Sequence, residues 1–103
     1  VTFVPVSFTP TASKFRGELC SGLNVVITDW QTFEPVRTGI HLACALRAQH
    51  EKAWDTKRLD WLLKHEPTAA AILAGTPADA IVASWKKDLE LFRMRRKPFL
   101  LYE

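Results

Sequence analysis

The residues best suited to chemistry lie in one polar stretch near the start of the chain, residues 9–22. This stretch has small hydroxyl side chains, two cations and two glycines, and it shows neither helical nor strand periodicity. An irregular connection of about a dozen residues is longer than most loops in a compact domain, and such loops are often functional. A plainer interpretation is also open, in which the hydroxyls bond their own turns and the lysine is solvated. The candidate binding residues are Thr9, Thr11, Ser13 and Lys14.

Histidine and cysteine form a second, weaker pattern. His41 and Cys44 lie three residues apart in a predicted helix, and Cys20 or His50 would be the further ligands of a metal site. Structural zinc sites show tight paired spacings, which this set lacks, so we expect no metal and no cofactor. For the two cysteines we favour free thiols, while one disulfide or metal ligation stays open.

Composition indicates one ordinary folded domain. The chain has 103 residues, a formal net charge of +3, 48% hydrophobic residues and 24% charged residues. No segment approaches the roughly 20 apolar residues of a membrane span, and a mildly basic charge does not indicate nucleic-acid binding. Because Val1 lies inside a strand-like run, we expect that a preceding region of the protein is missing. Four Trp and six Phe are many for this length, so we expect some of them to face a partner.

Alternation of apolar residues predicts strands on both sides of the polar stretch. Residues 1–8 and residues 23–28 alternate with period two and are rich in β-branched side chains. Pro5 cannot donate a ladder hydrogen bond, which places the first strand at a sheet edge. Residues 59–63 carry apolar side chains at alternate positions, and we expect a third, short strand there.

Helical spacing predicts a first helix that is entered through residues 29–35 and runs to about residue 48. A short helix is expected over residues 67–73, between a proline and a glycine. The apolar face of the first helix is expected to contain Val36, Ile40, Ala43 and Cys44.

The last predicted helix begins near residue 78 and reaches about residue 95. Thr76 is its expected cap, and Asp79 stands where the acid of a capping box belongs. Cations crowd its C-terminal end, where the helix dipole favours them, and this explains them without nucleic acid. We expect Pro98 to end the helix and a short extended tail to follow. The predicted buried stripe consists of Ile81, Val82, Trp85, Leu89 and Phe92.

These elements predict a small α+β domain that covers residues 1–103. A few short strands are expected to pack against two main helices and one short helix.

Three phrases of the sequence resemble one protein family. They are FTPTASKFRGELCSGLNVVITD, FEPVRTGIHLACAL and FRMRRKPFLLYE. Together they resemble the C-terminal domain of the exo-β-N-acetylmuramidases, bacterial hydrolases of peptidoglycan recycling, over essentially the whole chain. The most specific part of the likeness consists of Pro10, Ser13, Lys14, Gly17, Cys20, Gly22, Thr28 and Asp29.

The resemblance implies an activity, a partner domain and a location. Members of the family remove terminal N-acetylmuramic acid from the non-reducing end of peptidoglycan fragments. A larger N-terminal domain of Rossmann-like type is expected to carry the catalytic acid, and the substrate cleft lies between the two domains. The resemblance alone suggests a periplasmic or secreted protein.

Glycoside hydrolysis usually needs two carboxyl groups roughly 5–10 Å apart. The acids show no recognisable pairing, so we expect no catalytic residue in this chain, although the parent enzyme would be a glycoside hydrolase. The acids considered are Glu18, Asp29, Glu34, Asp55, Asp60 and Asp79.

Binding is the better expectation for the polar loop. Muramic acid bears a lactyl carboxylate, and the ammonium of Lys14 beside small hydroxyl donors suits such a group. The alternative is a non-catalytic module that docks on another protein through exposed aromatic residues.

Overall fold

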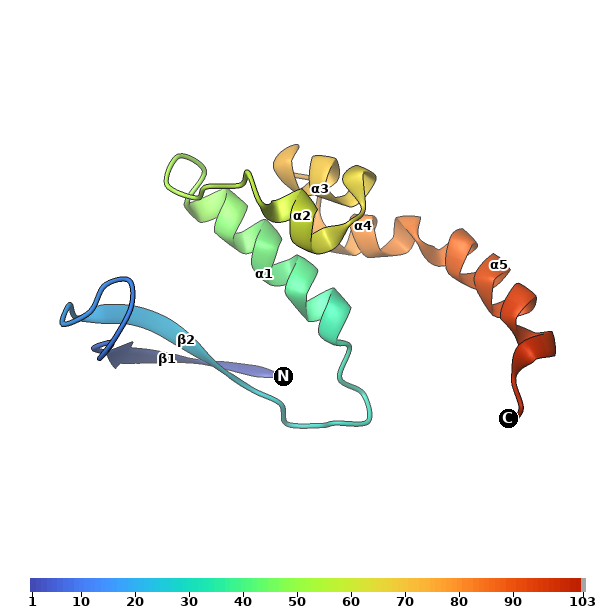
Figure 1. Cartoon of the computed structure of the whole chain (residues 1–103), viewed down its shortest axis with the longest axis horizontal. Helices are drawn as coiled ribbons and strands as arrows, with labels where there is room; N and C mark the ends of the chain where they lie inside the picture. Colours follow the sequence, from blue (N-terminus) through green and yellow to red (C-terminus); the bar gives the residue numbers. More distant parts are fainter. Residues whose placement is uncertain (103) are drawn as a thin grey trace. The chain divides into compact units, whose positions relative to one another are not determined.

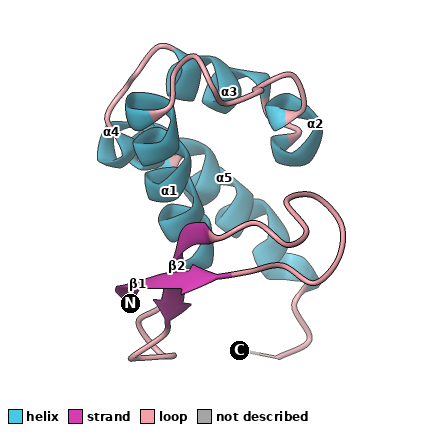
Figure 2. Ribbon diagram, turned by 90° about the vertical axis from the view of Figure 1, so that its left-hand side faces the viewer, coloured by secondary structure: helices cyan, strands magenta, loops and turns pink. Residues whose placement is uncertain are grey.

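The computed structural model describes residues 1–102, and the chain divides into two compact units. Residues 1–34 form a β-hairpin, and the unit that begins at Pro35 is helical (Figure 1). Figure 2 distinguishes the two strands from the helices by colour. The chain is therefore α+β, as the sequence predicts.

The hairpin pairs β1 (Thr2–Phe8) with β2 (Cys20–Val26) in antiparallel fashion. The strand predicted over residues 1–8 is confirmed to within one residue. The second strand was predicted over residues 23–28, but it begins three residues earlier and ends at Val26. The reason is the register, because β2 stays paired along the full length of β1.

Gly22 lets the polar start of β2 join the ladder. A Cβ atom at this position would lie 3.0 Å from Cε1 of the Phe8 ring, closer than side-chain atoms normally approach. Pro5 faces Leu23 in the register. Both strands are edges of a two-stranded sheet, which is the setting in which a proline is tolerated.

The hairpin has no core of its own. No residue from 1 to 34 is buried. A lone two-stranded hairpin is marginally stable in water, so this unit needs cover from elsewhere. Its strands carry six large apolar side chains that are 39–56% exposed, namely Phe3, Val4, Phe8, Leu23, Val25 and Val26.

The second unit is built from short helices that follow one another closely. None of the helices within residues 1–102 has the length and apolar character that crossing a bilayer would require. The elements are α1 (Pro35–Gln49), α2 (Leu59–Leu63), α3 (Glu66–Leu73), α4 (Ala78–Ser84), α5 (Lys86–Arg96) and the 3₁₀ turn η1 (Lys97–Phe99).

A small apolar core joins α1, α3 and α4. Ile40, Ile72, Ala78 and Ile81 form one buried cluster, and Ile72 has no exposed surface. The first predicted helix and the short helix are confirmed to within one or two residues, although the entry segment 29–34 is not helical and forms a turn at residues 30–32. Val36 was expected on the buried face and is instead 66% exposed.

The short strand predicted over residues 59–63 is wrong, because this segment is the helix α2. Leu59 and Leu63 are four residues apart, so one helical face presents both to the core. Trp61 and Leu62, on the rest of the turn, are 65% and 75% exposed. Lys64 then ends the helix in the left-handed conformation, with φ at 50°.

The last helix was predicted to be continuous, and the structure divides it into α4 and α5 at Trp85. The Trp85 backbone N–H bonds to the Val82 carbonyl, three residues back instead of four. The Ser84 hydroxyl donates to the Ile81 carbonyl at 2.6 Å, a contact that often bends helices.

The predicted stripe is therefore buried only in its first half. Ile81 is 2% exposed, whereas Leu89 and Phe92 are 47% and 49% exposed. The Thr76 cap is also wrong, because Pro77 occupies the N-cap position and no side chain caps α4. Beyond α5, residues 97–99 form η1 before the chain becomes extended at Leu100.

A hydrogen bond to α3 holds the side chain of Trp85 in place. Its indole Nε1 donates to Oγ1 of Thr68 at 3.1 Å, and Thr68 is 3% exposed. Oγ1 of Thr68 also lies 2.7 Å from Nδ1 of His65. Because an indole N–H can only donate, the threonine oxygen is the acceptor of this hydrogen bond. This chain of contacts ties the α4–α5 junction to α3.

We expect Trp85→Ala to lower the free energy of unfolding by about 3–5 kcal/mol, because it removes a large packed ring from the core. Urea unfolding followed by far-ultraviolet circular dichroism measures the change. Trp61→Ala is the matched control, since Trp61 is 65% exposed and should shift the midpoint little. Equal shifts for the two variants would contradict the packing described for Trp85.

Candidate functional site

The polar loop between the strands, residues 9–19, is closed by its own backbone. The Gly17 N–H donates to the Pro10 carbonyl at 2.9 Å, and the Glu18 N–H donates to the Phe15 carbonyl at 3.0 Å. Gly17 has φ at +79°, a conformation that favours glycine. The loop is therefore a defined turn and not an open strand connection.

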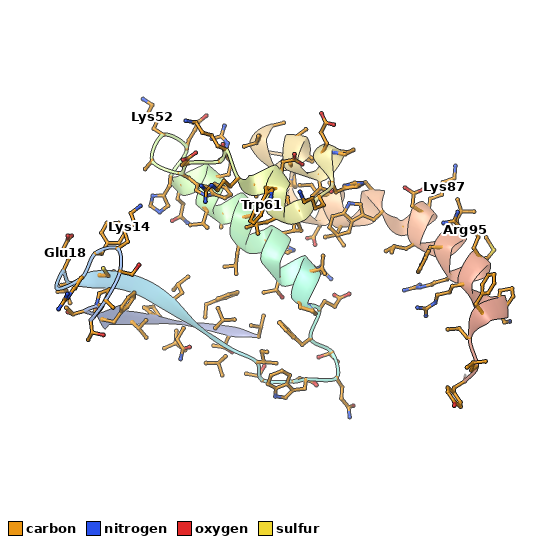
Figure 3. All side chains as sticks on the ribbon, viewed as in Figure 1. Lys14, Glu18, Lys52, Trp61, Lys87 and Arg95 are labelled. Carbon is orange, nitrogen blue, oxygen red and sulfur yellow. The ribbon has the colours of Figure 1, made fainter. Side chains whose placement is uncertain are left out.

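The four predicted binding residues lie together in this loop. Thr9, Thr11, Ser13 and Lys14 are all exposed. Figure 3 shows Lys14 and Glu18 projecting from it. Within residues 1–102 the three hydroxyls make no hydrogen bond to the protein, so they do not bond their own turns. Their donors and acceptors are available to a ligand.

Phe15 is a loop residue that sequence reasoning missed. Nζ of Lys14 lies 5.1 Å from the centroid of the Phe15 ring, and that ring is 52% exposed. The ring face attracts the ammonium and limits where it can move. Ser13 and Phe15 have φ at 65° and 61°, on either side of Lys14. Such values are uncommon for residues other than glycine, and they mark loops that hold unusual shapes. A Lys-Phe pair in a loop was the only signal in the sequence.

Neighbouring hydrogen-bond donors lower the pKa of two carboxyl groups. Oδ1 of Asp29 accepts the backbone N–H groups of Gln31 and Thr32 at 2.9 and 3.3 Å. The hydrogen bond from the Thr32 side chain, with these two, lowers the pKa of Asp29. The hydrogen bond from Arg47 likewise lowers the pKa of Glu51. A general acid requires a raised pKa, so neither group suits that role.

Asp79 links two helices and is not part of a capping box. Its Oδ1 accepts from Nη2 of Arg37 at 2.8 Å and lies 3.2 Å from Nε2 of His41. Arg37 and His41 are four residues apart on α1, so both reach α4 from the same face. The Arg37 hydrogen bond is the main cause that lowers the pKa of Asp79. The predicted capping role is wrong because a tertiary ion pair holds this carboxylate.

Each cysteine has a hydrogen-bond partner within its own unit. Cys44 donates to the Thr76 carbonyl at 3.7 Å, and burial raises the pKa of its thiol. Cys20 donates to the Glu18 carbonyl at 3.6 Å, and both thiols are free. Among the described residues, no group of three or more His, Cys, Asp or Glu side chains could hold a metal ion.

Comparison with known protein families shows to which family the chain belongs. The family model described as "Exo-beta-N-acetylmuramidase NamZ, C-terminal" matches residues 1–102. The chain belongs to this family. The resemblance found in the three sequence phrases is thereby confirmed.

A curated relative supports the same assignment for the NamZ C-terminal domain. The chain is 34% identical over 105 residues to the protein named peptidoglycan beta-N-acetylmuramidase NamZ from Bacillus subtilis (strain 168). The alignment covers 99% of this chain and 25% of that relative. The chain thus spans about a quarter of the length of the curated relative that it matches. No solved structure matches the chain.

The Asp79 ion pair of this NamZ domain gives a pH-dependent prediction. Because the pKa of Asp79 is lowered in the folded state, its stabilisation is present above the ordinary carboxyl pKa of 3.8 and is lost as the pH falls through the folded value. Asp79→Asn should therefore lower the urea midpoint at pH 7, and the difference from the unchanged protein should shrink below about pH 4. Glu90→Gln is a matched exposed control on α5. A difference that stays constant across this pH range would contradict the ion pair.

Proposed function

We propose that this domain lines the substrate cleft of an exo-acting β-N-acetylmuramidase and helps bind the terminal N-acetylmuramic acid of peptidoglycan fragments. Membership of the NamZ family and the name of the Bacillus relative support this function. The observation that carries the proposal is the exposed loop, in which Lys14 stands beside hydroxyls that make no hydrogen bond to any described residue.

The chemistry of the ligand explains the choice of residues. Muramic acid differs from glucosamine by a lactyl ether that ends in a carboxylate, and Lys14 would contact that carboxylate. A charge-assisted hydrogen bond is shorter and stronger than a neutral one. The Phe15 ring holds the ammonium near one position, so less side-chain freedom is lost on binding. The hydroxyls of Thr9, Thr11 and Ser13 can donate to the remaining carboxylate and sugar oxygens.

In this proposal the catalytic carboxyl groups lie in the rest of the enzyme. The resolved pKa shifts of carboxyl groups in this chain are all downward, for Asp29, Glu51 and Asp79. These groups stay ionised near neutral pH and cannot serve as a proton donor there. The domain would contribute binding and orientation.

A docking role is the second candidate, and exposed aromatic residues favour it. Trp30, Phe99 and Tyr102 are 76%, 83% and 87% exposed. The two roles are compatible if the partner is the remainder of the same enzyme.

The proposed function predicts that residues 1–103 alone release no muramic acid from a chromogenic muramide, whereas the full-length enzyme does. The physical reason is that Asp29, Glu51 and Asp79 have lowered pKa values and stay ionised near neutral pH, so they do not supply the proton that hydrolysis requires. Release is measured against a heat-inactivated sample. Turnover by the isolated domain clearly above that background would place the active site within it.

The second prediction is that Lys14→Met in the full-length enzyme lowers kcat/KM on a muramide by about tenfold to hundredfold, the loss expected for one charge-assisted bond. Lys14→Arg should retain most of the activity, because it keeps a cation over the Phe15 ring. A substrate analogue without the lactyl carboxylate should be nearly indifferent to either change.

Arg16→Met is the matched control, because Arg16 is an exposed cation in the same loop. An equal loss for Lys14→Met on both substrates would assign Lys14 a structural role. An equal loss for Arg16→Met would show that general charge, and not the Lys14 position, matters.

A further inference from the structure

One face of α5 and of the junction before it carries large apolar side chains that the helical unit covers only in part, at Trp85. Trp85, Leu89 and Phe92 follow one another at steps of four and three residues, so they lie on one side of the helix. We name these three residues the α5 apolar stripe. No residue of α5 is buried, and Leu89 and Phe92 are about half exposed. A contiguous apolar surface of this kind marks an interaction site more often than scattered exposed residues do.

The rest of the helical unit does not hold α5 in place. Within the described residues α5 packs only on α4 and η1, its neighbours in the chain, while α1, α3 and α4 pack on one another. Figure 1 shows α5 leading away from these three helices. A helix of 11 residues is marginally stable in water without tertiary contacts. A surface outside this unit must therefore stabilise it.

The stripe leads into a pocket of about 300 Å³. Trp85 and Leu89 form part of its wall, so the pocket and the stripe are continuous. Its surface is mainly apolar, with His65, Thr68 and Asp88 as the polar members. The other lining residues are Val36, Ile40 and Leu63. Pockets of this kind at the centre of an interface receive the anchoring side chains of a partner.

Charge argues against a second copy as the occupant. Residues 86–97 contain six cations and two acids. Figure 3 shows Lys87 and Arg95 on α5, and both are exposed. Two such helices would repel each other across a twofold interface, whereas an acidic surface would attract them.

The length of the relative points to a partner within the same polypeptide. The alignment covers 25% of the Bacillus NamZ protein, so three times as much chain lies outside the matched region of that relative. A tethered partner has an effective concentration in the millimolar range when the connection is short, so a modest apolar contact is enough.

We propose that the α5 apolar stripe and its pocket dock onto the remaining part of the enzyme. The docked surface is apolar at its centre and acidic at its rim, and one of its apolar side chains enters the pocket. This interface fixes the direction of α5. It does not depend on Lys14 or on the identity of the sugar.

Hydrogen exchange of the full-length enzyme tests the proposal through Phe92→Ser. We expect the α5 amides to exchange about tenfold to hundredfold faster in this variant, as for the loss of a central interface residue. The amides of α3 around Ile72 should be unchanged, because Phe92 is not part of that core. Their protection shows that the helical unit is still folded.

Met94→Ser is the matched control. Met94 is 63% exposed and lies on the opposite side of α5, two residues from Phe92. It should leave the α5 amides as protected as in the unchanged enzyme. Equal acceleration by the two variants, or no acceleration by Phe92→Ser, would overturn the proposal. So would a dimer in light scattering that Phe92→Ser converts to a monomer, because the occupant would then be a second copy.

Discussion

Ile72 has no exposed surface, and Ile40 of α1 and Ile81 of α4 close over it. This contact is the constraint on which the helical unit depends. Three short helices meet at it, and each of them would be too short to persist alone. The volume available is small, so only helices that reach this point are fixed by burial. The small size of this core explains why α1, α3 and α4 pack into one compact unit while α5 lies outside their core.

Polar contacts around the core also connect the helices to one another. Thr68 accepts the indole N–H of Trp85, the residue that lies between α4 and α5. Asp79 joins α4 to α1 through Arg37 and His41 at the surface. Exposed ion pairs of this kind contribute little stability. The core therefore supplies most of the stability of the helical unit, and these bonds connect its helices.

Sequence periodicity was sufficient wherever one pattern dominated. The hairpin, α1 and α3 were predicted because alternation, helical spacing, Pro and Gly agreed there. The prediction for residues 59–63 was wrong because Leu59 and Leu63 are four residues apart. This spacing places both on one face of a strand, as two repeats of period two, and also on one face of a helix, as one turn, so periodicity could not distinguish the two structures. The break at Trp85 coincides with a hydrogen bond from its indole to Thr68, a residue 17 positions earlier, and local patterns do not contain this contact.

The candidate site shows the same division. The loop could be located because small hydroxyl residues, glycines and a lysine are concentrated there. The contact between Lys14 and Phe15 could not be predicted, since it depends on left-handed backbone conformations on both sides of the lysine. The role of Asp79 was misjudged because the local capping pattern was complete, while its partner Arg37 lies 42 residues away.

The loop that carries Lys14 belongs to a hairpin with no buried residue. The folding of the hairpin and the ligand binding that we propose for its loop would therefore be thermodynamically linked. A ligand that binds only the ordered hairpin stabilises that order, and any surface that covers the strands raises the fraction of molecules ready to bind. The intrinsic affinity of the loop and the observed affinity of the protein then differ by this fraction. Under the proposed function, a surface that orders the hairpin would therefore raise the affinity of the loop for its ligand even where that surface does not touch the ligand.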